Sequence, residues 1–185
     1  MPAADALRLR ADVIENLHAF VPSDRLGVAD RDRTLAFLDD HPDGVDAGCQ
    51  DGHVTATSLV LSADGRATLL TLHARIRRWI ELGGHLEPED ADLAAAAARE
   101  GREESGRSDL ELDPTILTVR VHENVPCRHA PGTTHFDVYH VLRSPDADHA
   151  VISDESLDLR WFDVDRLPEP LGDGVAEVLA LTRRS

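Results

Sequence analysis

Three glutamates gather within five residues near the middle of the chain. Glu100, Glu103 and Glu104 belong to the stretch GGHLEPEDADLAAAAAREGREESG, which spans residues 83–106. Carboxylates this close repel one another when they are partly buried, unless a cation lies among them. A hard divalent cation such as Mg²⁺ or Mn²⁺ prefers carboxylate oxygens, and water or phosphate oxygens complete its shell. The cluster is therefore a candidate site for a divalent metal.

The periodicity of a helix relates these carboxylates to an apolar stripe. Residues three and four apart share one helix face, which joins Leu93, Ala96 and Ala97 and continues onto the three glutamates. Arg99 and Arg102 are expected to point roughly the other way. The face thus begins apolar, and so inward, and turns acidic halfway along the helix.

Two interpretations of this helix are open. One is a solvated helix braced by ion pairs between residues four apart, from Arg99 to Glu103 and from Glu103 to Arg107. The other is a metal-binding helix, which the preceding Gly83-Gly84 pair favours. Glycines between a strand and a helix allow a tight turn and close backbone approach, with carbonyl groups free to ligate a metal.

The stretch resembles the signature of the Nudix hydrolase family. That signature is Gly, five residues, Glu, seven residues, then Arg-Glu-aliphatic-x-Glu-Glu-x-Gly-aliphatic. The positions that agree are Gly84, Arg99, Glu100, Glu103, Glu104 and Gly106. Asp90 stands where Glu is usual, and one extra residue follows it before Arg99. Gly101 and Arg107 replace the aliphatic residues, and Leu82 stands where Pro often precedes the glycines.

The resemblance covers roughly residues 53–168 and implies a fold and a reaction. The fold is α+β, an α/β/α sandwich with a mixed sheet. The reaction is hydrolysis of a phosphoanhydride in a nucleoside diphosphate linked to another moiety, and it depends on Mg²⁺ or Mn²⁺. The matching subgroup looks bacterial, and its substrate is not settled by the resemblance.

The resemblance also implies roles for individual residues. Glu100, Glu103, Glu104 and the Gly84 carbonyl are expected to bind the metal, and Arg99 is expected to brace the glutamates. The family often takes a further acidic ligand from a loop before a late strand. Glu155, six residues before Trp161, is in the right kind of place, with Asp154 as its competitor. The candidates for the general base are Glu103, Glu100 and Glu155, in that order.

Three further residues are expected on the substrate side. His85 follows the glycines and is placed to contact a phosphate, and Trp79 either stacks on a base or belongs to the core. His135 ends the segment HENVPCRHAPGTTH, whose other candidate ligands are His122, Cys127 and His129. Their spacing does not match a standard zinc pattern. We therefore expect a mobile loop between two strands that shapes the substrate pocket.

Helices and strands must position these residues. An apolar stripe predicts a helix over residues 5–20, and a second helix follows, capped by Ser23 and closed by the HPDG turn at 41–44. Strands are expected at 53–61, 66–73, 116–122, 135–143 and 159–164, and a last helix at 174–184. Asp90 or Asp92 caps the glutamate helix near Ala91, and Gly106 ends it.

This order of elements divides the chain in two. Residues 1–45 are expected to form a helical extension whose apolar stripe packs on the sheet or on a second subunit, so that a homodimer is allowed. Residues 46–185 are expected to form the Nudix domain. Helices and strands follow one another as in an α+β protein rather than as repeated βαβ units.

Composition limits the partners and the location. The formal net charge is -16 with a pI of about 4.8, so nucleic acid polymers and anionic membrane surfaces are excluded as partners. No apolar run reaches the roughly 18 residues that span a bilayer. Cys49 and Cys127 provide no disulfide framework. A cytoplasmic protein acting on a small nucleotide-type substrate is expected.

Two other functions remain open. An isopentenyl-diphosphate-isomerase-like enzyme would share the fold, but that chemistry typically uses a cysteine near the front of the sheet, and neither Cys49 nor Cys127 is obviously placed for it. A non-catalytic Nudix-fold module that binds nucleotides or regulates would commonly lose the glutamates of the signature. Here Glu100, Glu103 and Glu104 all remain.

Overall fold

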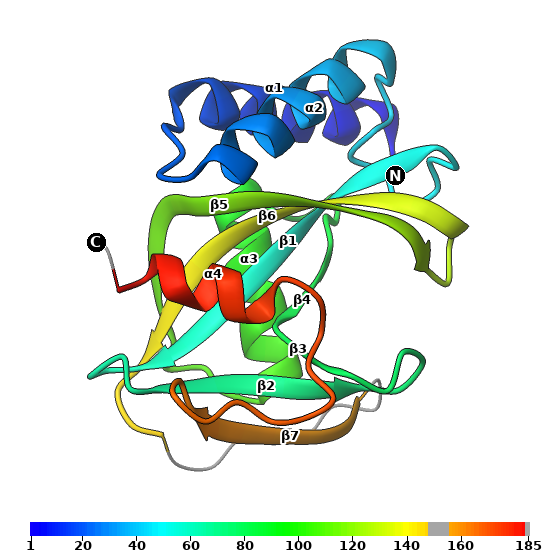
Figure 1. Ribbon diagram of the computed structural model, residues 1–185. Helices are drawn as coiled ribbons and strands as arrows, with labels where there is room; N and C mark the ends of the chain where they lie inside the picture. The colour runs from blue at the N-terminus through cyan, green and yellow to red at the C-terminus, as the bar shows by residue number, and fades with distance from the viewer. Residues whose placement is uncertain (148–155, 184–185) are drawn as a thin grey trace.

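The computed structural model describes residues 1–147 and 156–183 and shows four helices around a mixed sheet (Figure 1). The helices are α1 (Ala3–Ala19), α2 (Arg25–Asp40), α3 (Leu93–Ser105) and α4 (Val175–Leu181). The strands are β1 (Gly52–Ser62), β2 (Ala67–His73), β3 (Trp79–Ile80), β4 (Leu82–His85), β5 (Glu111–Pro126), β6 (Pro131–Ser144) and β7 (Ser156–Asp163). Within these residues, no helix is both long and apolar enough to cross a membrane.

Strand β1 lies at the centre of the seven-stranded sheet. It pairs in parallel with β6 along its whole length, and β5 continues that side of the sheet as an antiparallel neighbour. On the other side, β4 pairs with residues 55–58 of β1, and β2 pairs with residues 60 and 61. β7 and β3 both pair with β2. Parallel and antiparallel pairs occur together, so the sheet is mixed as predicted.

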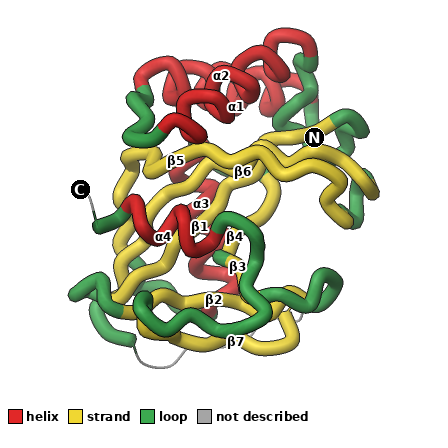
Figure 2. Tube along the Cα trace, in the orientation of Figure 1, coloured by secondary structure: helices red, strands yellow, loops and turns green. Residues whose placement is uncertain are grey.

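Side chains alternate between the two faces of β1 and so define the layers. Val54 and Ala56 face a core that they share with α1 and α3. Leu59 and Leu61 face the opposite core, which contains the buried residues of α4. Figure 2 shows α3 and α4 on opposite sides of the sheet. This layered α+β arrangement confirms the predicted fold class.

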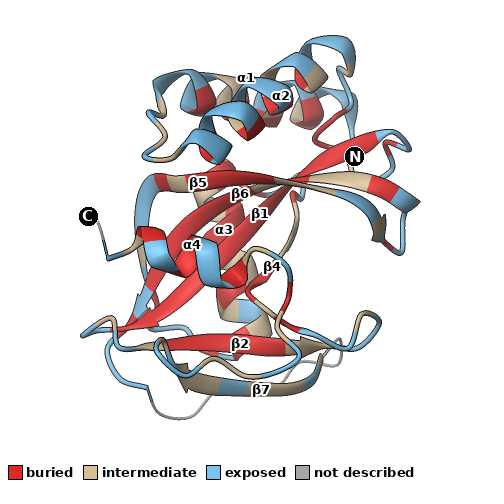
Figure 3. Ribbon diagram, viewed as in Figure 1, coloured by how far each residue is buried: buried red, intermediate tan, exposed pale blue. Residues whose placement is uncertain are grey.

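Helices α1 and α2 lie along the β5 side of the sheet and turn their apolar faces toward it (Figure 3). Leu9, Val13 and Leu17 of α1 are fully buried, as the apolar stripe predicts. Asp24 caps α2 by accepting a hydrogen bond from the Gly27 N–H at 2.9 Å. The prediction that Ser23 caps this helix is therefore wrong.

Two polar contacts tie α1 to the segment that leads into α3. The Arg8 guanidinium donates to the carbonyl oxygens of Pro88, Asp90 and Ala91 at 2.6–3.0 Å. The Asp12 carboxylate accepts a hydrogen bond from the Leu93 N–H at 2.8 Å. Helix α1 therefore holds the start of α3, the helix that carries the three glutamates.

Some elements differ from the sequence-based expectation. The expected mobile loop over residues 122–135 is wrong, because β5 runs to Pro126 and β6 begins at Pro131. The glycine pair lies in strand β4 rather than in a turn. α4 is shorter than expected. The long β5–β6 pair has several register shifts, and such irregularities carry little signal in a single sequence.

Candidate metal centre and active site

Helix α3 (Leu93–Ser105) lies between the caps Asp92 and Gly106. Asp92 is the N-cap and accepts a hydrogen bond from the Ala95 N–H at 2.7 Å, whereas Gly106 at the C-terminus has a φ of 65°. Glycine adopts this left-handed conformation at little cost. The extra residue of the signature lies before Arg99, so it leaves the spacing of Glu100, Glu103 and Glu104 within α3 unchanged.

The buried stripe of α3 continues differently from the helical prediction. It passes from Leu93 and Ala97 to Gly101 and Ser105, not onto the glutamates. The side chain of Glu100 is 14% exposed, whereas that of Glu103 is 62% exposed. The acidic face therefore borders the buried stripe, and Glu103 lies on its solvent side.

Gly101 lets α3 approach the sheet closely. A Cβ atom at this position would lie 2.7 Å from Leu142 Cδ2 and 3.1 Å from Ser58 Cβ, and both residues are buried. Close packing of α3 on the sheet therefore explains why glycine stands at position 101, where the signature has an aliphatic residue.

We expect Gly101→Ala to lower the free energy of unfolding by up to about 2 kcal/mol, as measured by urea denaturation. Alanine in a free helix would stabilise by roughly 1 kcal/mol, but overpacking typically costs about 1–3 kcal/mol. A variant more stable than the wild type would show that this helix–sheet contact has room.

The glycine pair of β4 lies directly against two of the glutamates. The Gly83 N–H donates to Glu104 Oε2 at 2.9 Å. A Cβ at Gly84 would lie 2.5 Å from Glu100 Oε1, so only glycine leaves this space beside the carboxylate. Gly83 has a φ of 149° and packs against the backbone of Ala56. Pairing of β4 with β1 thus brings the two glycines to the acidic face of α3.

Arg99 lies among the carboxylates, and the prediction that it points away from them is wrong. Its guanidinium makes two hydrogen bonds to Asp90, at 2.9 and 3.0 Å. It also reaches Glu100 Oε1 at 2.9 Å and Glu103 Oε2 at 3.2 Å. The long side chain curls back over its own turn, which a helical projection of Cα positions does not capture. Asp90 thus anchors Arg99 from the position where the signature usually has Glu.

The electrostatics of this face suit a divalent cation. Burial raises the pKa of Glu100 to about 7, although the Arg99 charge opposes the shift. Burial opposes the charge of Arg99 as well, but its hydrogen bonds to Asp90 and the Glu100 charge raise its pKa above the ordinary value. One guanidinium faces more carboxylates than it can neutralise. A partly buried carboxylate, a second carboxylate nearby and the glycine backbone beside them offer oxygen donors of the kind that Mg²⁺ or Mn²⁺ prefers.

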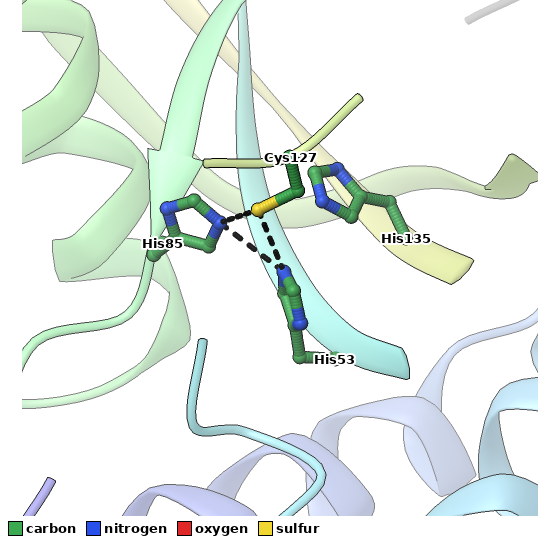
Figure 4. A group of neighbouring side chains, drawn as sticks. All are labelled: His53, His85, Cys127 and His135. Carbon is green, nitrogen blue, oxygen red and sulfur yellow. Dashed lines mark hydrogen bonds between the residues drawn. The ribbon is translucent and has the colours of Figure 1, made fainter. Parts of the chain in front are cut away.

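The three residues expected on the substrate side lie elsewhere. Trp79 is 7% exposed and packs edge-on against Phe162 with ring centroids 4.7 Å apart, so its ring belongs to the core. His85 and His135 converge with two other side chains on the sheet (Figure 4). Burial lowers the pKa of His85 to about 4 and that of His135 to about 3. Both rings are therefore neutral near pH 7 and offer no positive charge to a phosphate group. Glu155 and Asp154 lie outside the described residues, so their role stays a prediction.

Two functional candidates were not found from the sequence, His53 and Glu81. His53 is fully buried at the start of β1, within the histidine group. Glu81, between β3 and β4, is 8% exposed, and its Oε1 is buried without a hydrogen-bond partner among the described residues. Burial, followed by the charge of Asp137, raises the pKa of Glu81 to about 7. A single glutamate two residues before a glycine pair gives no sequence signal of such burial.

The buried Glu81 should make stability depend on pH. Because its pKa is raised in the folded state, the folded protein holds this proton more tightly than the unfolded chain does. The resulting stabilisation is present below the unfolded pKa of about 4.5 and is lost as the pH rises through about 7. Glu81→Gln removes this titration, so at about pH 8 the variant should be more stable than the wild type by roughly 1–3 kcal/mol. Chemical denaturation at several pH values measures the difference, and Glu177→Gln, at an exposed position, is the control. If the free energies of unfolding of Glu81→Gln and wild type changed with pH in parallel, the expectation would be contradicted.

Comparison with known proteins agrees with this geometry. A family model described as NUDIX domain matches residues 51–182. The crystal structure of a Nudix hydrolase from M. smegmatis, RenU, is similar with a TM-score of 0.53 and 22% identity, covering 71% of this chain and 84% of that one. A C. elegans Ap4A hydrolase binary complex is similar with a TM-score of 0.56 and 18% identity, covering 71% and 95%.

A third similar structure is the NUDIX domain of Shewanella oneidensis NrtR complexed with ADP ribose. Its TM-score is 0.51 with 14% identity, and the match covers 71% of this chain and 86% of that one. At these low identities the structural similarity shows a common fold and no more. No curated protein matches the chain. Because the family model covers most of the sequence and includes the glutamate helix and its glycine strand, the chain belongs to the NUDIX family.

Proposed function

We propose that this protein is a divalent-metal-dependent hydrolase that cleaves a phosphoanhydride in a nucleoside diphosphate linked to another moiety. The observation that carries the proposal is the contact between the partly buried Glu100 carboxylate and Gly84, with Glu104 on the neighbouring Gly83 N–H. Family membership and the complete set of signature glutamates support it.

The proposed metal ligands are Glu100, Glu104 and the Gly84 carbonyl, with Glu103 at the exposed rim. A bound Mg²⁺ or Mn²⁺ supplies charge neutralisation at the phosphate oxygens and lowers the pKa of a bound water. The metal also offsets the repulsion between an anionic substrate and a protein with a formal net charge of -16.

The residues of the chain hold and orient this centre. Arg99 holds Glu100 and Glu103 and is itself anchored by Asp90, so it positions the carboxylates. Glu103 is the first candidate for the general base, because it is held by Arg99 at 3.2 Å and is open enough to pass a proton to solvent. Glu100 is the second candidate. Glu155 remains the third on sequence grounds.

The experiment is a substrate panel with Mg²⁺ or Mn²⁺, using wild type and Glu103→Gln. The panel contains ADP-ribose, the ligand of the NrtR complex, a dinucleoside tetraphosphate, after the Ap4A hydrolase, and nucleoside triphosphates. It also contains dihydroneopterin triphosphate, after a structurally similar E. coli dihydroneopterin triphosphate pyrophosphohydrolase. We expect metal-dependent release of a mononucleotide or phosphate from at least one of them, and loss of the release with a chelator. Absence of release from every substrate with both metals would contradict the proposal.

Two additional measurements separate the alternatives. Conversion of isopentenyl diphosphate to its isomer without phosphate release would instead support the isomerase-like function. Tight binding of a panel nucleotide without turnover would support the non-catalytic module. If Glu103 is the base, Glu103→Gln should lower kcat by roughly 100-fold while KM changes little.

A further inference from the structure

Four side chains from four separate parts of the chain converge on one face of the sheet. His53 comes from β1, His85 from β4, Cys127 from the turn between β5 and β6, and His135 from β6. One potential ligand atom of each lies within 4.8 Å of the corresponding atom of every other. Figure 4 shows the three rings and the sulfur pointing toward a common centre.

The register of the sheet places the three histidines together. His53 and His135 are direct partners in the parallel β1–β6 pair. His85 is the partner of Thr55, two residues beyond His53, so its side chain lies on the same face. The turn that joins Pro126 to its partner Pro131 then brings Cys127 over this face. The group is therefore fixed by backbone pairing and not by flexible side chains alone.

The distances suit a tetrahedral metal ion. The Nε2 atoms of His53 and His85 are 3.1 Å apart, and Cys127 Sγ lies 3.9 Å from the first and 3.5 Å from the second. Zinc bonds are about 2.0–2.1 Å to nitrogen and about 2.3 Å to sulfur, so a tetrahedron has N···N edges of about 3.3 Å and N···S edges of about 3.6 Å. These three separations match the edges to within a few tenths of an ångström, and the ligand atom of His135 lies within 4.8 Å of the other three.

The second nitrogen of two rings faces an oxygen. His53 Nδ1 lies 3.5 Å from the Cys49 carbonyl oxygen, and His135 Nδ1 lies 3.9 Å from Asp137 Oδ1. Metal-binding histidines commonly use one ring nitrogen for the ion and direct the other toward a carbonyl or carboxylate oxygen. In both residues this arrangement leaves Nε2 for the common centre.

Hydrogen bonds within the described part of the protein do not satisfy every ring nitrogen of these three histidines. His135 Nε2 is buried and has no hydrogen-bond partner among the described residues. A buried polar atom without a hydrogen-bond partner costs free energy. With both rings neutral, one Nε2 of the His53–His85 pair can donate a hydrogen bond to the other. That hydrogen bond still leaves His135 Nε2 without a partner among the described residues. A cation at the centre would satisfy all four ligand atoms together.

We propose that His53, His85, Cys127 and His135 bind a zinc ion. Imidazole nitrogens and a thiolate are ligands that zinc prefers, whereas Mg²⁺ and Mn²⁺ prefer the oxygens of the glutamate face. Four protein ligands are typical of a structural site, with no position left for a reacting water. Binding forms a zinc–sulfur bond and releases the thiol proton of Cys127 to solvent.

This zinc site would stabilise the strand that borders the candidate active site. It joins the parallel pair β1 and β6 at the centre of the sheet to β4 and to the turn at residues 127–130. The backbone carbonyl of His85 accepts a hydrogen bond from Arg99 Nη2 at 2.8 Å, and His85 directly follows Gly84. Holding the His85 ring therefore also holds the glycine strand against the glutamate helix.

The test is the metal content and the spectrum of the full-length protein. After expression with zinc and dialysis against Mg²⁺, elemental analysis should find one tightly held zinc per chain. The protein loaded with Co²⁺ should show the intense visible absorption of a tetrahedral site and a thiolate-to-cobalt band in the near ultraviolet. Failure of both zinc and cobalt to bind in a one-to-one ratio would overturn the proposal.

Matched variants identify the ligands. Cys127→Ser and His53→Gln should weaken zinc binding by at least about 100-fold, and Cys127→Ser should abolish the thiolate band. Cys49→Ser tests the other buried cysteine, and His129→Gln tests a ring 5.2 Å from that of His85 that lies outside the group; both should keep the zinc. Zinc retained by both ligand variants would overturn the proposal. If the ligand variants do not fold, the wild-type cobalt spectrum decides, because absence of the thiolate band contradicts Cys127 as a ligand.

Discussion

Glu100→Gln should lower kcat/KM by at least about 100-fold on any panel substrate that the wild type hydrolyses, while the protein stays folded. The substitution removes the carboxylate that lies against Gly84, and with it the proposed metal ligand. Because burial disfavours the Glu100 charge, removing that charge should not destabilise the metal-free protein. Steady-state kinetics at several Mg²⁺ concentrations, together with thermal denaturation, measure both effects.

The control for this variant is Glu177→Gln. It removes the same charge from an exposed position on α4, on the opposite side of the sheet from α3. Wild-type kinetics are expected. Equal activity of Glu100→Gln and Glu177→Gln would contradict the metal role of Glu100 and favour a helix whose charges only face solvent.

Leu17→Ala should lower the free energy of unfolding by about 2–5 kcal/mol, the usual cost of truncating a fully buried leucine. Leu17 is 0% exposed in the core that α1 shares with α3 and the sheet, whereas Leu7 of the same helix is 59% exposed. Leu7→Ala is therefore the matched control and should change stability by less than about 0.5 kcal/mol. Urea denaturation of both variants measures the difference.

The same pair of variants tests the role that we propose for residues 1–45. If the extension were a tether beside an independent domain, Leu17→Ala would leave the stability of the sheet unchanged. A loss of cooperativity or a separate early transition in Leu17→Ala would also show that α1 folds apart from the rest. We expect instead one transition shifted to lower urea, because α1 also holds the start of α3 through Arg8 and Asp12.

Regular periodicity made much of the fold predictable. The stripe at Leu9, Val13 and Leu17 predicted α1, and the β-branched run after His53 predicted β1 within one residue at each end. Strand β4 was not predicted, because two glycines favour a turn in isolation. Its pairing with β1 comes from tertiary structure: the glycines let the backbone lie close to Ala56 and Glu100.

The glutamate site on α3 and the histidine–cysteine group differ in how far each could be predicted from the sequence. The three glutamates are close in sequence, so one helix brings them to one region, although the partial burial of Glu100 depends on the packing of α3 against β4. The histidine group is different, because His53 and His135 are far apart in sequence and meet only through the register of β1 and β6. Metal motifs recognised by short spacings cannot reveal ligands that are assembled by strand pairing.

The most direct test of the metal site on α3 is calorimetry of wild type and Glu104→Gln, with and without about millimolar Mg²⁺. Glutamine keeps an oxygen that can accept the Gly83 N–H, so the variant removes charge without leaving that donor unpaired. We predict that Mg²⁺ raises the wild-type Tm by a few degrees through mass action, and that Glu104→Gln shows little response and an equal or higher Tm without metal. If Mg²⁺ shifts neither protein and Glu104→Gln is simply less stable than the wild type, the glutamates serve only as structural ion pairs and the proposed metal site is wrong.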